Sequence, residues 1–424
     1  MNSQGISTAL GLIHPIVIQK GLNAEVWDEN GKRYIDFIGG IGVLNVGHCH
    51  PKIVHAIQHQ AEQLTHYAFN AAQHRPYLDL MQKLLAYIPI NQPLAGMFTN
   101  SGAEATENAL KVARIATGRT GVIAFDGGFH GRTLAAVNLN GKVKPYKDGL
   151  GPLPGPVYHI PYPSKDNQVT ANEAKHALKR LFQVEVDVEN IAAIIFEPVL
   201  GEGGFQLMDP EFAQYLRQFC DQHGILIIAD EIQSGFGRTG IPFAFAHLGI
   251  EPDLLLLGKS IAGGVPLGAV VGLAKYMDYP AKGALGGTYS GNPIACAAGL
   301  ATLDIMQSAE FQATTQNYIS TIENTYLRWK NQNLTPWLGR LTGVGAMRGI
   351  ELCHPELGAG TQQLANILAT ARAQGLLLMP SGEAKNIIRL LTPLTISAEV
   401  LNEGLAILEN ILAATATQSL EATA

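Results

Sequence analysis

The sequence is poor in cysteine, in charged residues, and in basic residues relative to acidic ones. Only 4 of its 424 residues are cysteines, and no two form a C-x-x-C pair, so we expect free thiols in a reducing compartment rather than a disulfide framework. Lys and Arg number 29 against 35 for Asp and Glu, a net charge of −6. No basic field is therefore available to bind nucleic acid or an anionic membrane.

Long apolar runs and a leader segment are also missing. The most apolar region, residues 253–277, is interrupted by Lys259, a Gly pair and Pro266, and is too broken to span a bilayer. Residues 1–12 show neither a basic segment nor a long apolar stretch, so no secretory signal is expected. These absences favour a soluble, cytoplasmic protein.

The chain is instead long and rich in apolar residues and glycine. At roughly 150 residues per domain, its length suggests two to three domains. It is 47% hydrophobic and only 15% charged, which excludes disorder and suggests that a partner subunit covers part of the surface. Glycine accounts for 46 residues, above the usual share of about 7%, and this indicates many tight turns.

The hydrophobic pattern predicts an arm followed by an α/β region. Residues 24–28 and 33–37 flank Asn30-Gly31, an arrangement typical of a β-hairpin. From about residue 51, helices alternate with continuous apolar runs, which indicate strands buried on both faces of a mostly parallel sheet with helices on both sides. These runs are residues 122–125, 191–196, 225–229, 254–257 and 267–271.

The pattern changes again after about residue 300. Strands are predicted at 344–352, 375–379 and 387–391, before a helix capped at Ser397 that we expect to fray after Ile411. The sequence thus predicts three parts. They are an N-terminal arm with a hairpin (1–50), a large α/β domain (51–300) and a smaller α+β C-terminal domain (301–424).

Polar residues that end the buried runs are candidates for chemistry, because ligands bind beyond the carboxyl ends of parallel strands. Asp230 follows the run 225–229, and Lys259 follows the run 254–257. The distance between them along the chain suits one crossover, so both should face one pocket. A partly desolvated lysine has a lowered pKa and a nucleophilic amine. An ordinary salt bridge at the sheet rim explains the same spacing equally well.

A second candidate site precedes the predicted helix 106–116. Ser101 and Glu104 fit a capping box, and Gly102 permits close backbone approach. The N–H groups at such a helix start can bind a phosphate. A helix that is simply well capped would show the same residues.

Two further motifs have weaker interpretations. Residues 235–240 match G-x-G-x-x-G, the glycine motif of dinucleotide-binding folds, but five residues separate them from the preceding apolar run. In such a fold an acidic residue also ends the next strand, whereas Glu251 here precedes it. We therefore reject a nicotinamide cofactor. His48-Cys49-His50 has no usual zinc spacing, and we expect no metal site there.

Six motifs occur in a fixed order along the chain. They are SGAEA (101–105), FHGRT (129–133), EPVLGEGG (197–204), DEIQ (230–233), GKS (258–260) and GGTYSGNP (286–293). With these motifs, the chain resembles the class III (ω-amino acid) aminotransferases, which use pyridoxal 5′-phosphate on the fold type I scaffold, over roughly residues 10–412. Residues 39–48 (GGIGVLNVGH) resemble most closely the 4-aminobutyrate aminotransferases of that family.

The resemblance implies roles for the cofactor-binding residues. Lys259 would bond to the cofactor aldehyde and later move the substrate proton, and Asp230 would keep the pyridine nitrogen protonated. Phe129 would stack on the ring. Thr288 would reach the phosphate of the neighbouring subunit, so the active sites would be shared in a homodimer or larger assembly. The full cofactor set is Ser101, Gly102, Ala103, Phe129, His130, Asp230, Gln233, Lys259 and Thr288.

The resemblance also implies a substrate site. Arg132 would clamp a carboxylate, and Ile41 would supply an apolar wall. Glu202 would neutralise Arg389 when an ω-amino acid is bound, and Arg389 would bind the α-carboxylate of glutamate or 2-oxoglutarate. The expected reaction is transfer of the amino group of 4-aminobutyrate to 2-oxoglutarate, which gives succinate semialdehyde and glutamate.

Two departures from the family pattern concern the amino donor. Leu200 replaces the usual glutamine after Glu-Pro-Val, and residues 380–386 lack the cysteine and aromatic residues associated with bacterial 4-aminobutyrate enzymes. N-Acetylornithine, ornithine and 5-aminovalerate therefore stay open as donors. Two alternatives to transamination are an oxidoreductase that binds its cofactor at residues 235–240, and an inactive family member that only binds ligands.

Overall fold

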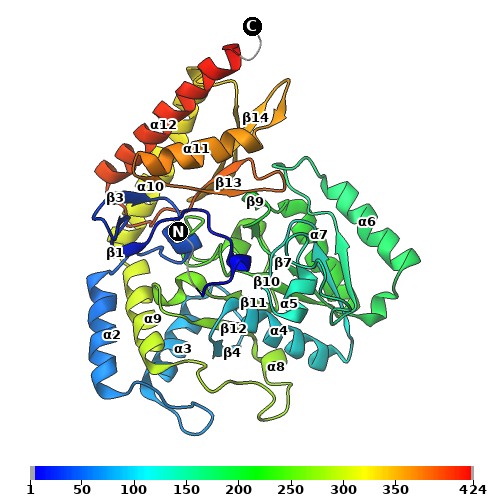
Figure 1. Cartoon of the computed structure of the whole chain (residues 1–424). Helices are drawn as coiled ribbons and strands as arrows, with labels where there is room; N and C mark the ends of the chain where they lie inside the picture. The colour runs from blue at the N-terminus through cyan, green and yellow to red at the C-terminus, as the bar shows by residue number, and fades with distance from the viewer. Residues whose placement is uncertain (1–4, 422–424) are drawn as a thin grey trace.

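The computed structural model describes residues 5–421, with side chains described up to residue 415, and its central element is a seven-stranded sheet (Figure 1). The strand order is β4-β12-β11-β10-β7-β5-β6, and β12 runs antiparallel to both of its neighbours. The predicted mostly parallel sheet is thus confirmed. Its strands are β4 (Leu94–Thr99), β5 (Gly121–Phe125), β6 (Val157–Ile160), β7 (Ile191–Phe196), β10 (Leu226–Asp230), β11 (Leu254–Leu257) and β12 (Gly268–Leu273).

Helices cover both faces of this sheet, which explains why its strands are continuously apolar. In β5, Val122 and Ala124 pack toward α4 (Gly102–Thr117), whereas Ile123 and Phe125 pack toward α6 (Ala171–Val184) and α7 (Pro210–His223). Successive residues of a strand point to opposite faces, so both sets must be apolar. The other helices of this region are α2 (Pro51–Gln63), α3 (Arg75–Tyr87), α5 (Leu134–Leu139), α8 (Ala274–Met277) and α9 (Pro293–Met306).

The N-terminal segment forms a small sheet of its own with part of the C-terminal region. The predicted hairpin is confirmed as β2 (Glu25–Asp28) and β3 (Arg33–Asp36), preceded by β1 (Ile18–Leu22). β3 also pairs in parallel with β16 (Leu376–Leu377). The short helix α1 (Gly39–Gly42) follows this sheet and carries Ile41.

The C-terminal region is an antiparallel sheet covered by helices, in the upper part of Figure 1. β13 (Leu338–Val344), β14 (Met347–His354), β18 (Ile387–Leu390) and β17 (Met379–Ser381) pair in that order. The short strand β15 (Gly358–Ala359) adds to β14. The helices are α10 (Ala309–Asn331), α11 (Thr361–Ala373) and α12 (Ala398–Glu421).

Three predictions for this region are corrected. The strand predicted at 344–352 is β14 from Met347 onward, but its first residues are the end of β13 and a turn at Gly345, where φ is +57° and a Cβ would lie 2.0 Å from the Thr239 carbonyl oxygen. The strand predicted at 375–379 is divided between β16 and β17, which belong to different sheets. The helix expected to fray after Ile411 continues to Glu421, in keeping with its alanine-rich composition.

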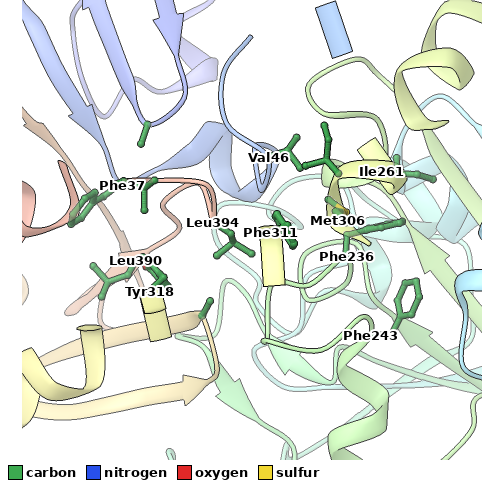
Figure 2. Packing of buried hydrophobic residues seen from close by; sticks show 14 of the residues in the cluster. Phe37, Val46, Phe236, Phe243, Ile261, Met306, Phe311, Tyr318, Leu390 and Leu394 are labelled. Carbon is green, nitrogen blue, oxygen red and sulfur yellow. The ribbon is translucent and has the colours of Figure 1, made fainter. Parts of the chain in front are cut away.

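One apolar cluster joins the arm, the large region and the C-terminal region. Figure 2 shows Phe37 and Val46 from the arm, Phe236 and Ile261 from the large region, and Leu390 packed in this cluster. The divisions predicted at residues 50 and 300 stay predictions, and α9 crosses the second of them. Within residues 5–421, no helix has the length and apolar character that a bilayer span requires.

Candidate active site

Asp230 and Lys259 lie at the carboxyl ends of neighbouring parallel strands, as their spacing predicts. Asp230 ends β10 and is opposite Leu256 of β11. Lys259 follows β11 and opens the short 3-10 helix η4 (Lys259–Ala262) with a φ of +44°. A positive φ is uncommon for a residue with a side chain, and such strain is concentrated at functional sites.

The environment of Lys259 favours its neutral, nucleophilic form. Burial lowers the pKa of its amine, while the Glu197, Asp230 and Glu202 carboxylates oppose this shift. The predicted desolvation is therefore present. A lowered pKa makes the amine a better nucleophile toward an aldehyde than the amine of an exposed lysine.

Asp230 is held by a buried histidine. Its Oδ2 lies 2.7 Å from Nδ1 of His130, and its Oδ1 accepts a hydrogen bond from the Ile232 amide at 3.1 Å. Asp230 is 3% exposed and His130 is 2% exposed. A buried carboxylate is costly unless a cationic group meets it, so Asp230 is suited to pair with a protonated ring nitrogen of a ligand.

Glu197 is a buried acid of the same site that the sequence analysis did not select. It directly follows β7, the strand beside β10, and its carboxylate accepts hydrogen bonds from the amides of Phe129 (2.9 Å) and Gly201 (3.0 Å). Burial and the charge of Asp230 raise the pKa of Glu197 to about 7. The strand-end rule that selected Asp230 would have found Glu197 as well.

The start of α4 has the helix cap that the sequence predicts, with one correction. Ser101 caps the helix by accepting a hydrogen bond from the Glu104 amide at 3.2 Å. The Glu104 carboxylate, however, accepts from the Asn100 amide at 2.7 Å rather than from Ser101, so the predicted capping box is not closed. A Cβ on Gly102 would lie 2.6 Å from Ile232 Cδ1, which shows that α4 begins close against the segment after Asp230.

The predicted pair of Glu202 and Arg389 is formed. Arg389 Nη2 donates to Glu202 Oε2 at 2.6 Å, and its Nε donates to the Pro380 carbonyl oxygen at 3.0 Å. Arg389 is 1% exposed. Burial opposes ionisation of the Glu202 carboxyl, but the Arg389 guanidinium outweighs it and lowers the pKa of Glu202.

A cavity of about 970 Å³ joins several of these residues, including Phe129, Glu202 and Arg389. Tyr146, which the sequence analysis did not select, lines it with its ring centroid 5.1 Å from that of Phe129. Burial and the Glu202 carboxylate raise the pKa of Tyr146, while the Arg389 and Arg132 guanidinium groups oppose the rise. Arg132 itself is exposed and does not line the cavity.

Four selected residues are exposed and do not line this cavity, namely Ile41, Ser101, Arg132 and Thr288. Ile41 is 44% exposed. Thr288 is exposed and lines a separate hollow of about 520 Å³ that includes Ala68 and Asn70. Within one chain, the structure does not bring Thr288 to Lys259.

The two weaker motifs have structural roles. Residues 235–240 form turns and not the strand-to-helix turn of a dinucleotide site, and Arg238 within them is fully buried. His48 pairs with Asp36 at 2.8 Å, and His50 caps α2 by accepting from the Lys52 amide at 3.3 Å.

Comparison with known proteins identifies the family. The model of the class III aminotransferases matches residues 8–412. The chain belongs to the class III aminotransferases. Among curated relatives, it is 64% identical to a 2-aminoadipate transaminase of Pseudomonas putida, over 97% of this chain and 99% of that protein. It is 43% identical to the Escherichia coli 4-aminobutyrate aminotransferase, over 96% and 95%.

Solved structures of this family share the fold. The taurine:2-oxoglutarate aminotransferase of Bifidobacterium kashiwanohense, in complex with pyridoxal 5′-phosphate and glutamate, has a TM-score of 0.86 at 28% identity, covering 94% of this chain and 92% of that one. The ornithine aminotransferase of Toxoplasma gondii has a TM-score of 0.84 at 28% identity, covering 98% and 93%. The fold is thus fold type I, as predicted.

The cofactor of this class III aminotransferase is pyridoxal 5′-phosphate, and the site fits it. Two buried polar atoms of residues selected for the cofactor, His130 Nε2 and Gln233 Oε1, have no hydrogen-bond partner among the residues whose side chains the structure describes. Buried polar groups without partners are costly unless a ligand satisfies them. The start of α4 adds free amide donors for a phosphate.

Proposed function

We propose that the protein transfers the amino group of 2-aminoadipate to 2-oxoglutarate, which gives 2-oxoadipate and glutamate. The observation that carries the choice of donor is the relative named 2-aminoadipate transaminase, which is 64% identical over nearly the full length of both chains. The donor expected from the sequence, 4-aminobutyrate, becomes the second candidate. The transamination chemistry is unchanged.

The charges of the site agree with a dicarboxylic donor. Arg389 is buried and lines the cavity, and the exposed Arg132, like Arg389, opposes the rise in the pKa of Tyr146, which also lines it. A guanidinium matches a carboxylate with two parallel hydrogen bonds. In this proposal Arg389 binds the α-carboxylate of both substrates, and Arg132 binds the distal carboxylate. 2-Aminoadipate is one methylene longer than glutamate, and the flexible, exposed Arg132 side chain accommodates that difference.

In this proposal, some residues around the cofactor stabilise the charge on its ring nitrogen, and one moves the substrate proton. Bound pyridoxal 5′-phosphate supplies an aldehyde that receives the amino group and a ring that withdraws electrons. Asp230 keeps the ring nitrogen protonated, and His130 holds Asp230. Lys259 would hold the cofactor through its amine and, as a free amine, would move the proton of the substrate α-carbon.

The other proposed cofactor contacts position the ring and the phosphate. Phe129 would stack on the ring, and the Glu197 carboxylate fixes Phe129 by accepting a hydrogen bond from its amide. Gln233 would bind the ring oxygen. Ser101, Gly102 and Ala103 at the start of α4 would hold the phosphate, together with Thr288 of the partner subunit.

One observation favours 4-aminobutyrate as the second candidate. Glu202 already neutralises Arg389 through the 2.6 Å contact, which suits a donor that has no α-carboxylate. The 43% identical Escherichia coli relative is named a 4-aminobutyrate aminotransferase, and a 42% identical Pseudomonas putida relative is named a 5-aminovalerate aminotransferase.

A donor panel with 2-oxoglutarate as acceptor tests the proposal. We expect kcat/KM for 2-aminoadipate to exceed that for 4-aminobutyrate and 5-aminovalerate by about tenfold or more, the discrimination that one missing charged contact provides. A higher value for 4-aminobutyrate would select the second candidate. A higher value for N-acetylornithine or ornithine would contradict both.

A further inference from the structure

Ser381 is a buried hydroxyl beside Arg389 that no role described so far explains. It is 3% exposed, it lines the 970 Å³ cavity, and its Oγ has no hydrogen-bond partner in the part of the chain that the structure describes. Leaving a buried hydroxyl unpaired costs free energy of folding. An unpaired buried hydroxyl therefore destabilises the fold, unless it forms a hydrogen bond with a ligand or in a second conformation.

The strand register places Ser381 and Arg389 on one face of the C-terminal sheet. β17 and β18 are antiparallel, with Met379 opposite Arg389 and Ser381 opposite Ile387. Ser381 is therefore the diagonal neighbour of Arg389, within reach of a long side chain. Both side chains line the same cavity.

The segment that carries Ser381 also holds both members of the Glu202–Arg389 pair. The Pro380 carbonyl accepts from Arg389 Nε at 3.0 Å, and the Gly382 amide donates to the Glu202 carbonyl at 3.1 Å. Arg389 Nη1 has no partner among the described residues, like Ser381 Oγ. Arg389 thus has one unpaired N–H group, and the Ser381 hydroxyl near it on the same sheet face is also unpaired. In the proposed function, an α-carboxylate replaces Glu202 as the partner of Arg389.

We propose that Ser381 is a specificity-determining residue of the α-carboxylate site. When Arg389 leaves Glu202 to bind an α-carboxylate, the Ser381 hydroxyl accepts a hydrogen bond from Arg389 and donates its own to the carboxylate. A hydroxyl can fill both roles at once because it has one donor and two acceptor sites. Ser381 therefore favours substrates with an α-carboxylate over ω-amino monocarboxylates. This inference rests on the proposed binding of the α-carboxylate by Arg389.

The test compares the holoenzymes of the wild type, Ser381→Ala and Ser381→Cys. We expect KM for 2-oxoglutarate and for glutamate to rise about tenfold in Ser381→Ala, the effect of one lost hydrogen bond to a charged group, with a smaller change in kcat. Ser381→Cys should behave similarly, because a thiol keeps the volume but is a weak donor. By contrast, kcat/KM for 4-aminobutyrate should change by less than about twofold.

Two controls separate this role from a structural one. Cys353→Ala shortens another side chain of the same cavity and should leave all these constants unchanged. The thermal midpoint of ligand-free Ser381→Ala should equal or exceed that of the wild type, because the variant removes an unpaired buried hydroxyl.

Three outcomes would overturn the role of Ser381. These are an unchanged KM for both dicarboxylates, an equal rise for 4-aminobutyrate, or a lowered thermal midpoint. If the wild-type enzyme did not react with glutamate at all, the proposed function itself would fail, before any variant is compared.

Discussion

Lys259 is surrounded by acidic side chains and yet shielded from water, and the balance of these two effects sets its reactivity. Burial lowers the pKa of its amine, and Glu197, Asp230 and Glu202 oppose that effect. The sequence predicted Asp230 and Lys259 because each ends an apolar run. The sequence did not predict Tyr146, which lies in a loop, or Ser381, which ends a short strand. These two residues become site candidates only because both line the cavity.

The pairing of Glu202 with Arg389 leads to a prediction at the same scale. Glu202→Gln removes the charge that neutralises a buried guanidinium, so we expect kcat/KM for 4-aminobutyrate to fall about tenfold. 2-Oxoglutarate brings its own α-carboxylate, and its KM should change less than about threefold. Steady-state kinetics of both reactions measure this.

Glu383→Gln is the matched control for that experiment. Glu383 lines the same cavity, but it has no ion pair with Arg389. It should change neither constant by more than about twofold. An equal loss for both substrates in Glu202→Gln would contradict the exchange of partners at Arg389.

At the scale of the elements, the sequence predicted the buried strands and the strand at 387–391 (β18) well, but it missed the turn at the start of the run 344–352 and the division of the run 375–379. The apolar runs 191–196 and 254–257 coincide with β7 and β11, because a strand buried on both faces must be apolar throughout. The run 344–352 hid a turn whose cause is the contact of Gly345 with Thr239, a residue distant in sequence. Tertiary contacts of this kind leave no local pattern.

Arg238 connects three separate elements and supports a prediction at this scale. It is fully buried, donates to Asn45 Oδ1 and to the Thr392 carbonyl, and thus ties the loop 235–240 to the arm and to the segment after β18. Arg238→Ala leaves a cavity and unpaired polar groups, so we expect a loss of about 3 kcal/mol of unfolding free energy.

Thermal and urea unfolding of the Arg238→Ala holoenzyme measure this loss. Arg180→Ala, an exposed substitution on α6, is the control and should stay within about 0.5 kcal/mol of the wild type. Equal stability of the two variants would show that Arg238 does not hold the three elements together.

At the scale of the whole molecule, a single chain leaves part of the expected site unfilled. Thr288 is exposed and lines a hollow other than the cavity that contains Arg389. Large apolar side chains are also exposed on the surface, among them Tyr67 at 49%, Leu134 at 57% and Tyr289 at 63%. Both observations agree with the proposed dimer, in which each subunit completes the site of the other.

Subunit mixing tests this sharing. Lys259→Ala should be inactive, and Thr288→Ala should bind the cofactor about tenfold more weakly through loss of a hydrogen bond to a charged group. In a mixed dimer with shared sites, one site has both defects and the other is intact. Subunit exchange between the two variants should therefore restore about a quarter of the wild-type sites at limiting cofactor.

Activity at low cofactor concentration measures the restored fraction, with each unmixed variant as its own control. No gain over the sum of the two separate variants would show that Thr288 acts within its own chain, or not at all.

The account depends most on the amine of Lys259 as the attachment point of pyridoxal 5′-phosphate. The direct measurement is borohydride reduction of the cofactor-saturated enzyme, followed by proteolysis and mass spectrometry of the peptides. We predict that the reduced cofactor is found on the peptide that contains Lys259, at the site beside Asp230. An unmodified Lys259, or attachment at another lysine, would contradict the account.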